Sequence, residues 1–568
     1  MDPTCLENIL SEDYGDFIFT YDNDFIELAA NNKFCYFLID NLYAVVYAKL
    51  SLVPPNIFHL YGYRVFPSCY GLLDNPSLDA SGITRVRSIP NLNLNGTGVL
   101  VAIIDTGIDY THEAFRLTDG TSKIYRIWDQ TIQTGTKPEG FYYGSEYTKE
   151  QINEALNSED PLSVVPSTDE NGHGTFLAGV ACGTRNDTEN FSGVAPLSEL
   201  VIVKLKPAKK FIKDFFIIPQ DAICYQENDI IIAIKYVLTI ASTYNRPISI
   251  CIGLGTSQGG HDARGALSSY LTAVASQRGV SVSIAGGNEG ASGHHFRSLL
   301  TKDTEYDTVE MRVGPSEPGF SMEFWGDTPS TFSIDILSPT GEYIPRIPAR
   351  IGESRVINFI FEHTVINVDY QLVEGQTGDQ LILVRFRNPT EGNWRFRVYS
   401  SSDLSLQYNV WLPITDFLSS DTNFVRPDPD YTLTSPGNTF IPMVVTAYNH
   451  VNNTIYRAAS RGFTRVNEIS PDFAAPGVNM IGPSLNNTYT ISSGTSLAAA
   501  HVAGIGAMIL EWGIVNNNYP TLDSVEIRNL LIRGAKRDPN TIYPNRTWGY
   551  GIVDVYNTFS SLRGDQSL

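Results

Sequence analysis

The sequence predicts an α/β protein whose parallel sheet is flanked by helices, with a small α+β unit before it and an antiparallel β domain inserted into it. Three observations support this prediction. Continuous apolar runs alternate with helical patterns, short β-rich segments fill a central stretch, and the N-terminal stretch has a strand pattern of its own. We expect boundaries that separate residues 1–72, 73–297, 298–425 and 426–568, with the second and fourth parts forming one domain.

Residues 1–72 are expected to form the α+β unit. Two apolar runs, at 34–39 and 43–47, flank Asp40-Asn41 and predict a hairpin of strands. Residues 25–30 are more typical of a helix. A unit of this size buries little apolar surface, so we expect it to be only marginally stable alone.

The parallel sheet is predicted from runs such as 99–104, 248–252 and 280–285, whose sequences are typical of strands buried along their whole length. A strand covered by helices on both faces has no side that meets water, so its sequence does not alternate. The pattern returns at residues 440–445, where we expect the same domain to resume.

The inserted domain, residues 298–425, is expected to be antiparallel and jelly-roll-like. Its short β-rich segments include 332–336, 381–386 and 394–398, and turn residues such as Glu391-Gly392-Asn393 separate them.

Composition excludes several functional classes. The formal net charge is −21, which would repel a phosphate backbone, so we expect no nucleic-acid binding. No run reaches the roughly 18–20 apolar residues of a membrane span. The N-terminus lacks the basic start and apolar run of a signal peptide, so we expect synthesis in the cytoplasm without export by that route. The six cysteines show no paired spacing and are expected to be mostly buried free thiols.

Three residues are candidates for catalysis. Asp105 directly follows a buried strand, where sites form in α/β sheets, although a plain turn would have the same sequence. His173 lies between two glycines that allow close approach to its ring, and a hydrogen-bonded structural histidine is the alternative. Ser496 enters a helix of small residues whose N-terminus favours negative charge, and a simple N-cap is the alternative.

Together these residues supply an acid, a base and a nucleophile in the chain order Asp, His, Ser, and this pattern resembles the subtilisin family of serine proteases. The resemblance implies that Asp105 orients the imidazole, His173 takes the hydroxyl proton and Ser496 attacks a peptide carbonyl, which makes the chain a serine endopeptidase. Asn288, in a Gly-rich turn after a buried strand, matches the family's side-chain oxyanion donor. Gly253-Leu254-Gly255 resembles the strand edge that binds substrate.

The segment around Ser496, the inserted β domain and the missing signal peptide are most similar to the clostridial Csp spore germination proteases. This likeness implies that residues 1–72 are a prodomain that the enzyme itself cuts off, between Ser68 and Asp74, and that is a partner of the cleft either in cis or as a cleaved fragment. It also implies a protein substrate, a spore cortex lytic pro-enzyme, and a location in the spore. The alternative function is a catalytically silent protease-fold sensor or binding protein in germinant signalling.

No metal site or cofactor is expected. His112, His294 and His295 lack carboxylate or cysteine partners at ligand spacing, so hydrogen-bonded or surface histidines are the preferred interpretation. The oxygen-rich loop at residues 184–190 aligns with a calcium loop of secreted relatives, which leaves calcium as the one alternative, although a solvated turn is favoured.

Overall fold

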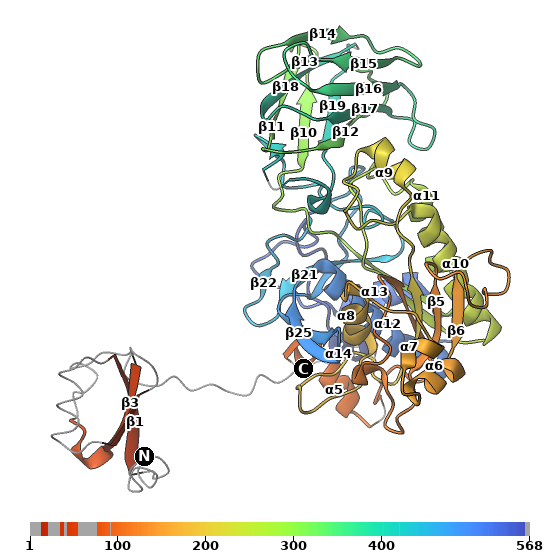
Figure 1. Ribbon diagram of the computed structural model, residues 1–568, viewed down its shortest axis with the longest axis vertical. Coiled ribbons are helices and arrows are strands. Elements are labelled where there is room, and N and C mark those ends of the chain that lie inside the picture. The colour runs from red at the N-terminus through yellow and green to blue at the C-terminus, as the bar shows by residue number, and fades with distance from the viewer. Residues whose placement is uncertain are drawn as a thin grey trace. The chain divides into compact units, whose positions relative to one another are not determined.

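The computed structural model describes residues 13–20, 35–38, 43–54, 76–90, 92–401, 403–419 and 421–562. The chain divides into two compact units, Met1–Asp74 and Asn75–Leu568 (Figure 1). The expected prodomain cut, between Ser68 and Asp74, lies outside the described residues.

The first unit contains a three-stranded antiparallel sheet in the order β1-β3-β2, made of β1 (Tyr14–Thr20), β2 (Cys35–Leu38) and β3 (Tyr43–Lys49). The pairing of β2 with β3 confirms the predicted hairpin. The helical pattern at 25–30 lies outside the described residues. Cys35 is disulfide-bonded, so the expectation of free thiols is wrong there. Cys182, Cys224 and Cys251 are free and buried.

The second unit is built on a nine-stranded sheet in the order β22-β21-β9-β8-β4-β7-β5-β6, with β23 also pairing with β21. The pairs from β21 to β5 are parallel, and β6 and β22 add antiparallel edges. The strands are β4 (Leu100–Asp105), β5 (Ile124–Asp129), β6 (Ser145–Thr148), β7 (Glu199–Lys204), β8 (Ile248–Ile252), β9 (Val280–Ala285), β21 (Met443–Asn449), β22 (Thr454–Ile455) and β23 (Phe473–Pro476).

Helices cover both faces of this sheet. Val101 and Ile103 of β4 pack into the core with α8 (His173–Cys182) and α12 (Thr495–Leu510). Their neighbours Leu100, Ala102 and Ile104 pack into the core with α10 (Glu227–Thr243) and α11 (Ala266–Ala275) on the opposite face. Because both sets of side chains are buried, the strand sequence is continuously apolar, as predicted.

The small residues of α12 let this helix lie close against the sheet. Ser249 and Ser283 donate from Oγ to the carbonyls of Ala503 and Ala499, at 2.7 and 2.9 Å. A Cβ added at Gly506 would lie 2.3 Å from Ser281 Oγ. Residues Thr495–Val515 are long and apolar enough to cross a membrane, but 83% of that stretch is buried inside the protein, as in the core helix of a folded domain.

The inserted domain consists of two antiparallel sheets that enclose one apolar core. The six-stranded sheet has the order β10-β19-β12-β17-β16-β15 and the five-stranded sheet the order β14-β13-β18-β11-β20. Figure 1 shows this domain at one end of the second unit, beside α9 (Lys210–Phe216). Its strands are β10 (His295–Leu300), β11 (Asp307–Val313), β12 (Gly319–Gly326), β13 (Phe332–Leu337), β14 (Tyr343–Ile347), β15 (Ser354–Asn358), β16 (Val365–Gln371), β17 (Gln380–Arg387), β18 (Gly392–Ser400), β19 (Leu406–Trp411) and β20 (Asn423–Phe424).

Shorter elements complete the described structure. They are η1 (Leu50–Leu52), α4 (Pro76–Ala80), α5 (Ile83–Ser88), η3 (Glu113–Phe115), α6 (Lys149–Leu156), α7 (Pro161–Val164), η4 (Thr415–Phe417), β24 (Met480–Ser484), β25 (Thr488–Ser492), η5 (Glu511–Val515), α13 (Ser524–Gly534) and α14 (Val555–Ser561).

Candidate active site

Three elements of the second unit bring Asp105, His173 and Ser496 together. Asp105 is the last residue of β4, His173 the first of α8 and Ser496 the second of α12. The distance from His173 Nδ1 to Asp105 Oδ1 is 2.8 Å, and His173 Nε2 lies 3.1 Å from Ser496 Oγ. Both are hydrogen-bond distances. The imidazole therefore connects a carboxylate to a hydroxyl.

The electrostatics of the imidazole are set by Asp105, whose side chain is 1% exposed. Its Oδ1 also accepts a hydrogen bond from the backbone N–H of Thr106 at 2.8 Å. Burial by itself lowers the pKa of His173, but the charge of Asp105 and its hydrogen bond outweigh burial and raise this pKa. The site thus stabilises a positive imidazolium, which is what a base that accepts a proton must become.

The start of α8 is fixed by Asp169, a residue that sequence reasoning missed. Its Oδ1 accepts from the backbone N–H of Asn171 and Gly172 at 3.0 and 2.9 Å. Its Oδ2 accepts from both the backbone N–H and the hydroxyl of Thr175, at 3.0 and 2.7 Å. An acidic residue just before a helix satisfies the free N–H groups of the first turn, and here it also sets the position of His173.

Two glycines keep the space around Ser496 open. A Cβ added at Gly253 would lie 3.3 Å from Ser496 Cβ and 3.4 Å from His173 Cε1. A Cβ at Gly494 would lie 3.3 Å from Ser496 Oγ and 3.8 Å from Asn288 Nδ2. The hydroxyl and the Asn288 amide therefore border the same small space, which is the geometry required of an oxyanion donor.

The predicted substrate-binding residues Gly253, Leu254 and Gly255 follow β8 and line a cleft of about 1330 Å³ that also contains His173, Asn288 and Ser496. Thr256 continues this edge and exchanges two backbone hydrogen bonds with Ser435, at 2.9 and 2.8 Å.

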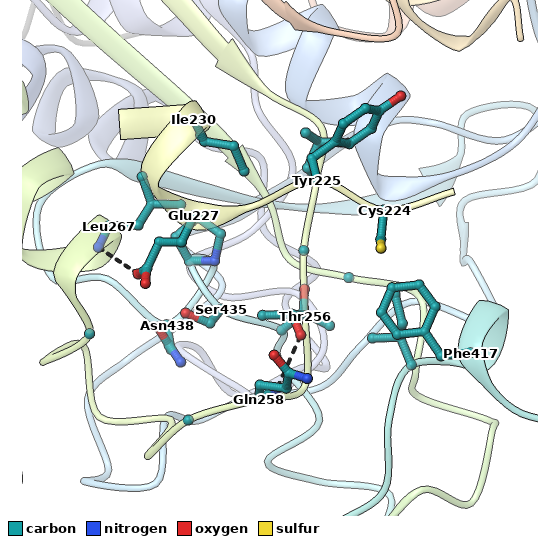
Figure 2. Close-up of a pocket in the computed structure, with 18 of the residues that line it drawn as sticks. Cys224, Tyr225, Glu227, Ile230, Thr256, Gln258, Leu267, Phe417, Ser435 and Asn438 are labelled. Atoms are coloured by element: carbon teal, nitrogen blue, oxygen red, sulfur yellow. Dashed lines mark hydrogen bonds between the residues drawn. The ribbon is translucent and has the colours of Figure 1, made fainter. Parts of the chain in front are cut away.

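Figure 2 shows one part of this cleft, where Glu227 accepts a hydrogen bond from the backbone N–H of Leu267. In the same view Ile230 lies on the side of Glu227, whereas Cys224 and Phe417 lie on the opposite side. The wall is therefore mostly apolar with a few polar groups, as is usual for a binding cleft.

Thr434 shapes the cleft and was not predicted. A Cβ added at Gly255 would lie 2.4 Å from Thr434 Oγ1, and one added at Gly287 would lie 2.6 Å from the same atom. The threonine side chain therefore fills the gap between these two glycines. Its contribution could not be read from sequence, because the whole β domain separates it from Gly287.

In the described part of the chain, no group of three or more His, Cys, Asp or Glu residues is placed to hold a metal ion. Asn186 of the loop at 184–190 accepts the backbone N–H of Thr188 and Glu189 and so folds a turn. His112 and His295 are buried and bonded within the protein rather than at its surface, and buried His294 contacts Glu289 at 2.9 Å.

Comparison with known proteins identifies relatives of this architecture. A model of the subtilase family, peptidase family S8, matches residues 96–309 and 417–551. The structure of the CspB protease from Clostridium perfringens superimposes with a TM-score of 0.76 at 30% identity, over 87% of this chain and 100% of that chain. The unmatched residues between the two family segments fall within the β domain.

More distant relatives are found among curated proteins. The C5a peptidase of Streptococcus pyogenes serotype M6 is 22% identical over 515 residues, which is 84% of this chain. Subtilisin DY of Bacillus licheniformis is 38% identical over 81 residues, 14% of this chain and 26% of its own length. The chain spans about 40% of the length of the C5a peptidases that it matches.

Proposed function

Because the chain belongs to the subtilase family of serine proteases, we propose that it is an endopeptidase with Ser496 as nucleophile, His173 as general base and Asp105 as the residue that orients the imidazole. The observation that carries this proposal is the unbroken set of contacts from Asp105 Oδ1 through both ring nitrogens of His173 to Ser496 Oγ, at 2.8 and 3.1 Å.

The geometry supports acyl transfer. Ser496 Oγ attacks the scissile carbonyl while His173 Nε2 takes its proton, and the buried Asp105 carboxylate stabilises the imidazolium that forms. The carbonyl oxygen becomes negative in the space beside Gly494, where Asn288 Nδ2 and the backbone N–H of Ser496 donate to it. His173 then returns the proton to the leaving amine, and water releases the acyl group by the reverse sequence.

We further propose that residues 1–72 act as a prodomain that assists folding, is cut by the enzyme itself and stays bound as a fragment. The division of the chain into units at Asp74 and Asn75 supports a boundary near the expected cut. The likeness to the CspB protease supports a role in spore germination, in which a protein made in the cytoplasm and kept in the spore activates a cortex lytic pro-enzyme.

A fluorophosphonate probe, which labels activated serines, tests the proposal on the full chain. We expect wild type to be labelled and cut near residue 72, and Ser496→Ala to be unlabelled and uncut. Ser493→Ala is the matched control, since this nearby hydroxyl accepts only the backbone N–H of Asn479 in the described structure. A folded wild type without labelling, with or without its prodomain, would favour the silent sensor instead.

A further inference from the structure

The cleft is lined by acidic residues without basic ones. Its lining contains six carboxylates and, among the described residues, no lysine or arginine. The same cleft holds the proposed nucleophile. The negative charge of the cleft therefore acts directly on any polypeptide that binds there. The carboxylates belong to Glu227, Asp262, Glu289, Glu323, Glu374 and Asp416.

Two of the six carboxylates pair with an arginine or a histidine. Asp262 lies 3.5 Å from Arg465 Nη2, and Glu289 lies 2.9 Å from His294 Nδ1. The other four form no ion pair with any described residue. Their charge is therefore available to a ligand.

Glu323 is the most unusual of the four. It lies in β12 of the β domain, its side chain is buried with 6% exposure, and burial raises its pKa. Its Oε2 accepts only neutral donors, Trp325 Nε1 at 2.9 Å and the backbone N–H of Gly259 at 3.0 Å. A buried carboxylate without a counter-charge is costly, and a cation from a bound substrate would relieve that cost.

Glu374 comes from the loop between β16 and β17 and lines the same cleft. Its Oε2 accepts the backbone N–H of Gln376 and Thr377, at 3.0 and 2.8 Å, which holds the carboxylate in place. The β domain therefore contributes two fixed carboxylates to a cleft whose nucleophile belongs to the other domain.

The neighbouring lining residues suit a long cationic side chain. Trp325, Leu381 and Leu383 of the β domain line the cleft with Glu323. Aliphatic surface accommodates the methylene stem of lysine or arginine, and carboxylates beside it attract its charged end. An acidic pair next to apolar and aromatic surface is thus the chemistry that recognises such a residue.

The chain's own sequence provides an independent observation. Between Asp40 and Asp74 there is no acidic residue, whereas Lys49 and Arg64 occur there. This is the stretch that leads to the expected self-cleavage position. A segment that must enter an acidic cleft in cis therefore lacks like charge and carries arginine a few residues before the cut.

We propose that the cleft selects substrate segments with a lysine or arginine bound against the β domain, and that Glu323 and Glu374 are the specificity-determining residues. This inference rests on the proposed peptidase function and names the substrate class for it. Arg64 is the arginine of the chain's own sequence that this preference would select in self-cleavage.

The first test digests a proteome-derived peptide library with the self-processed protein and identifies the cut sites by mass spectrometry. We expect lysine and arginine to be enriched about tenfold at one position outside the scissile pair, as a charge-assisted contact allows. Glu323→Gln with Glu374→Gln keeps the acceptor oxygens and should abolish the enrichment. Glu391→Gln, exposed on the same domain, is the control and should retain it.

Fluorophosphonate labelling separates the two levels of failure. If wild type is labelled normally but its cut sites show no enrichment of lysine or arginine, this inference is overturned and the peptidase proposal stands. The same holds if the double variant is labelled normally and keeps the full enrichment. Absence of labelling and cutting in wild type overturns both. If the double variant is not labelled, Glu374→Gln alone is used, and unchanged enrichment there counts against the inference.

The second test measures self-cleavage of the full chain. Arg64→Gln is expected to slow the appearance of the cut product about tenfold, and Arg64→Lys to restore it. Lys49→Gln is the matched control, because it also removes one positive charge from the acid-free stretch but lies farther from the cut. Equal rates in Arg64→Gln and Lys49→Gln would contradict the assignment of Arg64.

Discussion

Asn288 Oδ1 accepts two hydrogen bonds from Thr495, one from the backbone N–H and one from the hydroxyl, each at 3.1 Å. The amide is thereby held with its oxygen toward the helix start, so its nitrogen is the atom presented beside Gly494. The residue before the proposed nucleophile thus sets the orientation of the proposed oxyanion donor.

Thr495→Val tests this relationship. The variant removes both hydrogen bonds of the Thr495 hydroxyl, the one it donates to Asn288 Oδ1 and the one it accepts from the backbone N–H of Gly287, and keeps the buried volume. We therefore expect kcat to fall about three- to tenfold with KM nearly unchanged. Thr495→Ser retains the hydroxyl and should behave like wild type. Steady-state kinetics on one quenched peptide provides both parameters, and a change in KM alone would contradict the orienting role.

Gly494→Ala should obstruct the oxyanion space. Gly494 has an extended backbone with φ 169°, so alanine causes no backbone strain, but its methyl group would lie 3.3 Å from Ser496 Oγ. We expect kcat/KM and the rate of fluorophosphonate labelling to fall at least about tenfold, while thermal unfolding stays close to wild type. Equal labelling rates would show that this space is not used.

The pH dependence of kcat/KM follows from His173. Only the neutral imidazole accepts the Ser496 proton, so activity falls as pH decreases through the pKa of His173. Because Asp105 raises this pKa, the acid limb should have its midpoint above the usual value of about 6.5. Asp105→Asn should lower the overall rate strongly and shift the midpoint to lower pH. If the acid midpoint of Asp105→Asn equals that of wild type, Asp105 is not the residue that raises the pKa of His173.

Arg465 is expected to hold the two domains of the second unit together. Its side chain is 2% exposed, and it pairs with Asp327 and Asp379 of the β domain at 2.8 and 2.7 Å. Arg465→Met removes the buried partner of two partly exposed carboxylates and should lower the free energy of unfolding by about 1–3 kcal/mol. Denaturant unfolding measures this, with Arg185→Met, a fully surface pair with Asp187, expected to change little. Equal losses in both variants would contradict the interdomain role.

The features that sequence predicted are those encoded locally. Continuous apolar runs such as β4 predicted the buried parallel strands because burial on both faces leaves a one-dimensional signature. Asp105, His173 and Ser496 were recognised because each lies in a short motif at the end of a strand or the start of a helix. The hairpin of β2 and β3 followed from two apolar runs and a polar turn.

The features that sequence did not predict depend on packing between distant segments. The hydrogen bonds of Asp169 all go to nearby residues, and its position before the histidine was a usable signal for an N-terminal cap. Thr434 and Glu323 had no such signal, because both line the cleft together with residues far away in the sequence. The disulfide of Cys35 is likewise a property of the folded unit.

The position of α12 has a consequence for synthesis of the protein. Its contacts with Ser249 and Ser283 hold the helix that carries Ser496 against strands that are translated much earlier, and the β domain is translated between them. A nascent chain that still lacks this helix has an acid and a base but nothing for them to activate. The order of the polypeptide itself therefore delays the first hydrolytic event until almost all of the scaffold has been translated.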